Sequence, residues 1–219
     1  MKGLFITGTD TDVGKTYIAC QIASELNKRN INVIPRKPVE TGCKLINNIL
    51  LPDDANLLLK ASQSSSSLDD VCPYRFTQAI SPTVAAKLSG ESISLKQLSF
   101  ACTNNISDTD FLLVEGAGGF YSPICDNALN SDLAIELQLP IILVTDDRVG
   151  AVNQALLTIN AIENSNLSIT GILLSSTNND SFNKLADNTS ELSRLTNYPV
   201  YKVSHNHTIP VDLIERILR

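Results

Sequence analysis

Long apolar runs, paired cysteine motifs and an excess of positive charge are all missing from this sequence. No apolar run approaches the length of a membrane span, which argues against a membrane-embedded protein. The five cysteines are widely spaced and form no C-x-x-C pair, so neither a zinc site nor a disulfide framework is indicated. A formal net charge of −6 argues against a general role on nucleic acid or on a membrane surface. The cysteines are expected to be reduced thiols, and the sequence enters an apolar run at its start without a signal peptide. We therefore predict a cytoplasmic protein.

Apolar runs and helical patterns alternate along the chain, which is typical of an α/β fold. Its 219 residues, 43% of them hydrophobic, suffice for a single domain over 1–219. Strands are expected at 3–7, 31–35, 110–114, 140–145, 169–174 and 199–203. Helices are expected at 15–29, 53–61, 82–89, 94–105, 131–138, 150–163 and 181–195, and the stretch 62–108 has little strand signal. Because the apolar runs are continuous, we predict a doubly wound, mostly parallel sheet with helices on both faces. Ligands of such sheets bind at the carboxyl ends of the strands.

The stretch from Gly8 to Thr16, G-T-D-T-D-V-G-K-T, indicates a phosphate-binding loop. It lies between an apolar run and a helical pattern, where backbone N–H groups and a helix N-terminus can converge on phosphate oxygens. Lys15 is expected to reach the terminal phosphates and the Thr16 hydroxyl to bind Mg²⁺. The usual pattern has its first glycine where this chain has Thr9, and Gly8 stands one residue early. The strand–loop–helix context favours a P-loop over a chance G-K-T on a surface turn.

Glu115 directly follows the expected strand 110–114 and opens the sequence E-G-A-G-G. A P-loop protein places its second metal-anchoring carboxylate at such a position, and glutamate offers the same hard oxygen as the commoner aspartate. The glycines allow a ligand to approach the backbone closely. The alternative is a tight turn after a strand, with an incidental glutamate.

Lys37 follows the second expected strand in R-K-P-V-E-T-G. Pro38 keeps the residue before it extended, so Lys37 is not absorbed into a helix. A lysine at this edge can place a point charge on a transferring phosphoryl group, although one found alone is more often a solvated surface residue.

Two further segments look like helix N-termini. Asp53 and Asp54 precede an apolar run; capping is the simpler interpretation for Asp53, while Asp54 by itself remains open. The helix that opens at 150–153 has N–H groups able to hold an anion such as a substrate carboxylate, or it is a plain connection.

Together these segments resemble the dethiobiotin synthetase family. The family's G-T-D-T-x-V-G-K-T, K-P-V-x-[ST]-G and V-E-G-A-G-G occur here in the same order and with similar spacing, to about residue 175. The resemblance implies an ATP- and Mg²⁺-dependent ligase of biotin biosynthesis that converts 7,8-diaminononanoate and CO₂ (bicarbonate) to dethiobiotin. A carbamate of the diamine would attack the γ-phosphate, and the resulting carbamic–phosphoric anhydride would close to the ureido ring. The resemblance also implies a homodimer, with the substrate tail crossing the interface.

The resemblance assigns site residues as well. Lys37, Lys15 and Thr11 would be catalytic, and Thr16, Asp54 and Glu115 would bind Mg²⁺. The nucleotide would contact Asp12, Val13, Gly14, Lys15, Thr16, Tyr17, Asp54, Glu115, Gly116, Ala117, Gly118, Ser175, Ser176, His205, Asn206 and His207. The diamine would contact Thr41 and, across the interface, Gly150, Ala151, Val152 and Asn153.

Two departures from the family pattern concern the base of the nucleotide. Ser175 and Ser176 stand where the family often has Asn-Asp to read adenine, and 205–207 (H-N-H) replaces a proline-led segment that clamps the base. The preference for ATP over another nucleoside triphosphate is therefore open. A metal site at His205 and His207 lacks a third ligand nearby, so exposed loop histidines are the favoured interpretation.

The main alternative is a ParA/MinD-like switch ATPase, which acts through a partner or a surface. That group shares the sheet and the shifted P-loop but normally carries a second lysine, in K-G-G-x-G-K-[ST]. Asp10 occupies that position here, and a negative charge is a poor substitute for a lysine that contacts phosphate. A stand-alone relative of the cobyric-acid amidotransferase synthetases would usually carry a fused glutaminase domain, which this length excludes.

Overall fold

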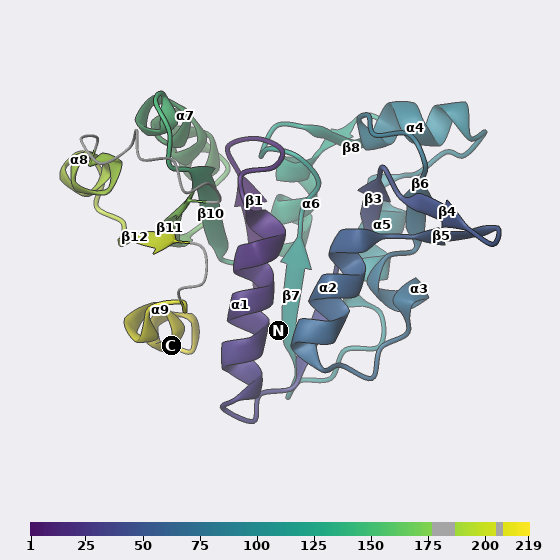
Figure 1. Cartoon of the computed structure of the whole chain (residues 1–219), viewed down its shortest axis with the longest axis horizontal. Coiled ribbons are helices and arrows are strands. Elements are labelled where there is room, and N and C mark those ends of the chain that lie inside the picture. The colour runs from purple at the N-terminus through teal and green to yellow at the C-terminus, as the bar shows by residue number, and fades with distance from the viewer. Residues whose placement is uncertain (177–186, 205–207) are drawn as a thin grey trace.

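The computed structural model describes residues 1–176, 187–204 and 208–219, and Figure 1 shows their arrangement. Among these residues a six-stranded sheet has the order β12-β11-β10-β1-β7-β2. Every neighbouring pair in it is parallel, which confirms the predicted fold. Its strands are β1 (Lys2–Gly8), β2 (Val33–Arg36), β7 (Phe111–Glu115), β10 (Ile141–Asp146), β11 (Ile169–Ser176) and β12 (Val200–Ser204).

Nine helices occur in the described part of the chain. They are α1 (Lys15–Asn27), α2 (Asp53–Ser62), α3 (Leu68–Val71), α4 (Pro82–Leu88), α5 (Leu95–Thr103), α6 (Asn130–Leu137), α7 (Ala151–Asn164), α8 (Asn188–Leu195) and α9 (Val211–Ile217). The sequence predicted seven of them to within a few residues, except that part of the helix expected at 181–195 lies outside the described residues. It missed α3, whose four residues are too few to show a helical period, and α9. No helix in the described ranges has the length and apolar character needed to cross a bilayer.

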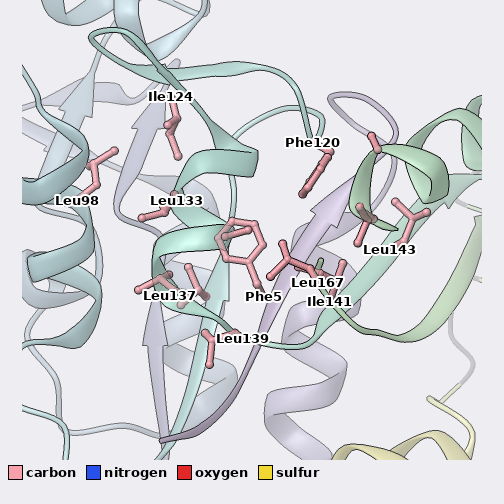
Figure 2. Close-up of a cluster of buried hydrophobic side chains, with 14 of the residues drawn as sticks. Phe5, Leu98, Phe120, Ile124, Leu133, Leu137, Leu139, Ile141, Leu143 and Leu167 are labelled. Atoms are coloured by element: carbon pink, nitrogen blue, oxygen red, sulfur yellow. The ribbon is translucent and has the colours of Figure 1, made fainter. Parts of the chain in front are cut away.

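Alternating side chains of the strands face two separate cores. Leu4 and Ile6 of β1 pack with α1, α2 and α9 on one face. Phe5 points to the other face, where it packs with side chains of α6 such as Leu137 and with Ile141 of β10 (Figure 2). Covering both faces explains why the strands read as continuous apolar runs.

β2 begins at Val33, two residues later than predicted, because the turn that ends α1 continues beyond the last residue of the helix. Asn30 is in the left-handed region at φ 59°, and the N–H of Ile31 donates to the Leu26 carbonyl at 3.2 Å. Such bonds close the last turn of a helix, so the extended chain starts only at Val33.

Short strands outside the main sheet were not predicted. β3 (Val39–Thr41) pairs in parallel with β6 (Tyr74–Phe76), β4 (Lys44–Ile46) forms a hairpin with β5 (Ile49–Leu51), and β8 (Pro123–Cys125) pairs with β9 (Ala128–Leu129). Runs of two or three residues carry too little periodicity to be recognised. Apart from β6, the stretch 62–108 consists of short helices, α3, α4 and α5, joined by loops and turns, which agrees with the expected lack of strands. The hairpin links β3 to the start of α2 (Figure 1).

The strand order explains how distant segments meet. β7 lies between β1 and β2, and Ile6 of β1 is in register with Glu115 at the end of β7. Arg36, the last residue of β2, is in register with Val114. The loop after β1, Glu115 and Lys37 therefore emerge side by side at one edge of the sheet.

Candidate active site

The loop after β1 presents an uncapped helix N-terminus. Gly14 is the N-cap residue of α1 at φ 95°, a left-handed conformation that suits glycine, and no side chain caps the helix there. The first turn of α1 contains no acidic residue. Asp12 is also left-handed, at φ 57°. The first N–H groups of α1 are therefore suited to an anion.

The early glycine of the loop has a steric reason. A Cβ atom at Gly8 would lie 2.7 Å from Cγ2 of Val13 and 3.2 Å from Cδ of Lys15, so the loop folds directly over this position. Thr9, where the usual pattern has glycine, instead donates its hydroxyl to Oγ1 of Thr145 at 3.1 Å. That bond fixes the loop to β10.

Lys15 lies back across the loop. Its Nζ donates to the Asp10 carbonyl oxygen at 2.7 Å, and the residue is buried. Burial, and secondarily the nearby Lys37, lowers the pKa of Lys15 to about 8. A polyanion bound beside it would favour the charged form.

The three residues expected to bind Mg²⁺ meet around Lys37. The Thr16 hydroxyl donates to Glu115 Oε1 at 2.7 Å. Lys37 Nζ donates to the same oxygen at 2.6 Å and to Asp54 Oδ2 at 3.0 Å. It also reaches the Gly116 carbonyl oxygen at 3.4 Å. The buried lysine therefore pairs with two carboxylates that come from different elements, and its single charge offsets one of their two.

These contacts decide the charge of the cluster. Burial acts to lower the pKa of Lys37, but the attraction of Glu115 and Asp54 outweighs it and raises that pKa above its ordinary value. Burial likewise acts to raise the pKa of Asp54, yet Lys37 and the Thr16 hydroxyl hold it below its usual range. Lys37 is therefore a cation and Asp54 an anion at neutral pH.

The donor set fits a magnesium ion. Glu115 Oε2 is buried and has no hydrogen-bond partner among the described residues, so a hard acceptor is left unpaired beside the Thr16 hydroxyl and Asp54. Mg²⁺ typically takes one or two carboxylates and completes its shell with water and phosphate oxygens. No group of three or more histidine, cysteine or acidic side chains suited to a metal occurs in the described ranges.

A cavity of about 330 Å³ opens over this cluster. Its lining comes from Thr11, Asp12, Gly14, Lys15, Thr16, Tyr17, Lys37, Val39, Glu40, Thr41, Asp54, Glu115, Ala117 and Gly118. Most of the predicted site residues for phosphate, metal and substrate thus share one space. Val13 is buried in the core below, and Gly116 faces Lys37 through its carbonyl group.

The remaining predicted residues lie elsewhere. Ser175 and Ser176 end β11, two strands from β1, and the Ser176 hydroxyl donates to Asp147 at 3.5 Å. Residues 150–153 begin α7 and do not line this cavity; Gly150 caps the helix at φ 90° without a side-chain hydrogen bond. His205, Asn206 and His207, which were also predicted to contact the nucleotide, lie outside the described residues.

Two residues at the site had no predicted role. Asn130 is fully buried; its Oδ1 accepts from the Ala117 N–H at 3.0 Å and its Nδ2 donates to the Gly119 carbonyl at 3.1 Å. It thereby holds the glycine loop after β7. Glu40 lines the cavity and contacts the start of α2. Neither has a sequence signal, because the contacts of each are made with backbone groups eight or more residues away.

Comparison with solved structures shows the fold. MinD in the MinC:MinD complex of Aquifex aeolicus and the ParA-family ATPase of Chlorobium tepidum match with TM-scores of 0.56 and 0.55, at 13% and 14% identity. The match covers 99% of this chain, and 86% and 89% of those chains. At such identity the similarity concerns architecture alone.

Sequence comparison is more specific. The family described as AAA domain matches residues 2–211. The ATP-dependent dethiobiotin synthetase BioD of Vesicomyosocius okutanii is 42% identical over 219 residues, which cover 100% of this chain and 97% of that protein. The BioD of Clostridium botulinum (strain Eklund 17B) is 35% identical over 91% of this chain and 89% of its own length. With such identity over nearly the whole of both chains, the protein belongs to the family of ATP-dependent dethiobiotin synthetases.

Proposed function

We propose that this protein is an ATP-dependent dethiobiotin synthetase that joins CO₂ to 7,8-diaminononanoate and closes the ureido ring. The observation that supports this best is the shared cavity over the P-loop, Lys37, Asp54 and Glu115. Members of the family carry the same activity in their names. The enzyme is a ligase that couples formation of carbon–nitrogen bonds to ATP cleavage.

The proposed reaction needs positioned charge and no covalent enzyme intermediate. One amine nitrogen of the diamine attacks CO₂ and loses a proton, which gives a carbamate. A carbamate oxygen attacks the γ-phosphorus and ADP leaves. The second amine then attacks the carbamoyl carbon, phosphate leaves, and that nitrogen loses a proton to give the ureido ring. Negative charge develops mainly on phosphoryl oxygens, where preorganised cations lower the barrier.

The chain's own groups suit these tasks. Residues of the P-loop hold the phosphates on the first turn of α1, and Lys15 and Lys37 are two buried cations on the cavity wall. Bound Mg²⁺, held by Thr16, Asp54 and Glu115, would neutralise phosphate charge. Thr41, Thr11 and the loop after Glu115 would face the diamine and its carbamate.

We place the carboxylate tail of the diamine on α7 of a partner subunit in a homodimer. The start of α7 has no capping side chain and no acidic residue in its first turn, so its N–H groups suit an anion. Residues 150–153 do not line the cavity of their own subunit, which agrees with a role across an interface. The five free cysteines agree with a cytoplasmic protein.

The decisive experiment is an ATPase assay with and without the diamine and bicarbonate, together with mass detection of dethiobiotin. Hydrolysis that requires both compounds, with dethiobiotin formed, supports the proposal. Hydrolysis driven by a protein partner or DNA would instead support the switch-ATPase alternative. Titrating ATP, CTP and GTP in the same assay tests which base is accepted.

A further inference from the structure

Helix α2 carries Asp54 in its first turn, but this end of the helix has no cap from its own flanking sequence. The N-cap residue is Pro52, which makes no side-chain cap hydrogen bond. Asp53, the first residue of α2, instead pairs with Lys44 of the hairpin at 2.6 Å. Unsatisfied N–H groups at a helix start favour fraying, and fraying here would move Asp54.

Glu40 of β3 supplies the missing cap. Its Oε1 accepts from the N–H of Asp54 at 3.0 Å, and its Oε2 accepts from the N–H of Ala55 at 2.9 Å. Glu40 is 7% exposed, and Ala55 is fully buried. Both carboxylate oxygens are therefore engaged with the backbone of α2, 14 and 15 residues further along the chain.

The charge of Glu40 fits this place. A carboxylate at a helix N-terminus interacts favourably with the helix dipole and makes charge-assisted hydrogen bonds to the N–H groups. The contact bridges the hairpin β4–β5, which separates β3 from α2 in the chain. It fixes the backbone of Asp54 relative to β3, and Asp54 in turn meets Lys37 at 3.0 Å.

We propose that Glu40 is a positioning residue of the magnesium site, which clamps the first turn of α2 so that the Asp54 carboxylate stays beside Thr16, Lys37 and Glu115. Position 40 is the open position of the K-P-V-x-[ST]-G pattern, so the family resemblance gives it no role. The inference rests on the proposed function, because Asp54 is a metal ligand only within it.

The test uses Glu40→Gln and Glu40→Ala in the full-length protein, with Asp53→Asn as the matched control. Asp53 lies on the same turn but is exposed and makes no cap. Binding of Mn²⁺ in the presence of a non-hydrolysable ATP analogue, followed by electron paramagnetic resonance, reports the metal site directly. Hydrogen exchange of the Asp54 and Ala55 amides reports the cap.

Loss of a group that orients a metal ligand typically weakens metal binding by about 10–100-fold. We expect about tenfold weaker Mn²⁺ binding in Glu40→Ala, a smaller loss in Glu40→Gln, and faster exchange at both amides. Raising Mg²⁺ should restore most of the kcat for dethiobiotin synthesis in both variants. Asp53→Asn should match the wild type in every readout.

Two results would overturn the inference. Faster amide exchange with unchanged Mn²⁺ binding would make Glu40 a structural cap alone. A raised KM for the diamine with unchanged Mn²⁺ binding would make it a substrate contact. Glu40→Gln, nearly identical in shape, carries the test if Glu40→Ala does not fold. Failure of the proposed function is seen separately, as wild-type protein that makes no dethiobiotin.

Discussion

Replacing Lys37 by methionine tests how much the buried charge cluster contributes to stability. Methionine keeps much of the side-chain volume but removes the cation between Glu115 and Asp54. The Glu115 side chain is 0% exposed and that of Lys37 is 5% exposed, so the variant leaves a carboxylate buried without its partner. Breaking a buried ion pair in this way costs about 3–5 kcal/mol.

For a domain of this size, such a loss lowers Tm by about 6–20 °C. The matched control is Lys44→Met, because Lys44 Nζ also lies 2.6 Å from a carboxylate oxygen, that of Asp53. There the two side chains are 67% and 61% exposed, and water screens such a pair so that it adds little to stability. Burial is thus the main difference between the two pairs.

Thermal and urea unfolding, followed by circular dichroism, measure both losses. Lys37 lowers the pKa of Asp54 in the folded protein. The stability that this ion pair contributes is therefore fully present above the pKa of Asp54 in the unfolded chain, about 4. It disappears as pH falls through the lower pKa that Asp54 has in the folded protein. The difference between wild type and Lys37→Met should therefore narrow below about pH 4. Adding Mg²⁺ should stabilise Lys37→Met more than the wild type, since the carboxylates lack their internal cation. Equal losses for Lys37→Met and Lys44→Met would refute the reasoning.

Three more outcomes are expected. Asn153→Ala should raise KM for the diamine more than KM for ATP; a change confined to ATP in steady-state kinetics would contradict the interface site. Asn130→Ala should lower the free energy of unfolding by about 1–3 kcal/mol, because the glycine loop loses a buried partner. Gln138→Ala on the surface should change the free energy of unfolding far less. Equal changes in urea unfolding would count against the role of Asn130 in holding the loop. Burial raises the pKa of the Cys20 and Cys102 thiols to about 12, so the native protein should react slowly with a thiol reagent at pH 8. All five cysteines should react after unfolding. Rapid labelling of the folded protein would contradict this prediction.

The parallel sheet and its long helices were predictable from sequence because each is a local pattern. Continuous apolar runs mark strands with both faces covered, and the G-K-T context marks the P-loop. That Lys37 and Glu115 lie at the same edge of the sheet also follows from sequence, once both are placed at strand ends. The contact at 2.6 Å depends in addition on β7 lying between β1 and β2, which no local pattern encodes.

The positions of Glu40 and Asn130 were not predictable in the same way. Each side chain satisfies backbone N–H groups of a distant segment, and a backbone group carries no signature in the sequence. The short strands β3 to β6 belong with them, since two or three residues show no period. The sequence thus indicates which residues carry charge to the site, whereas the groups that orient them emerge only from the tertiary structure.

The position of β7 between β1 and β2 has a consequence for changes in chain length. Successive side chains of a strand point to opposite faces, so one residue inserted within β7 would exchange the two sets of inward-facing side chains and rotate Glu115 away from Thr16. The hairpin β4–β5 carries no such constraint, because Leu45, Ile46 and Ile49 are largely exposed and Glu40 joins its two ends independently of its length. A change in chain length is therefore expected to disturb the site far less at the hairpin than within β7.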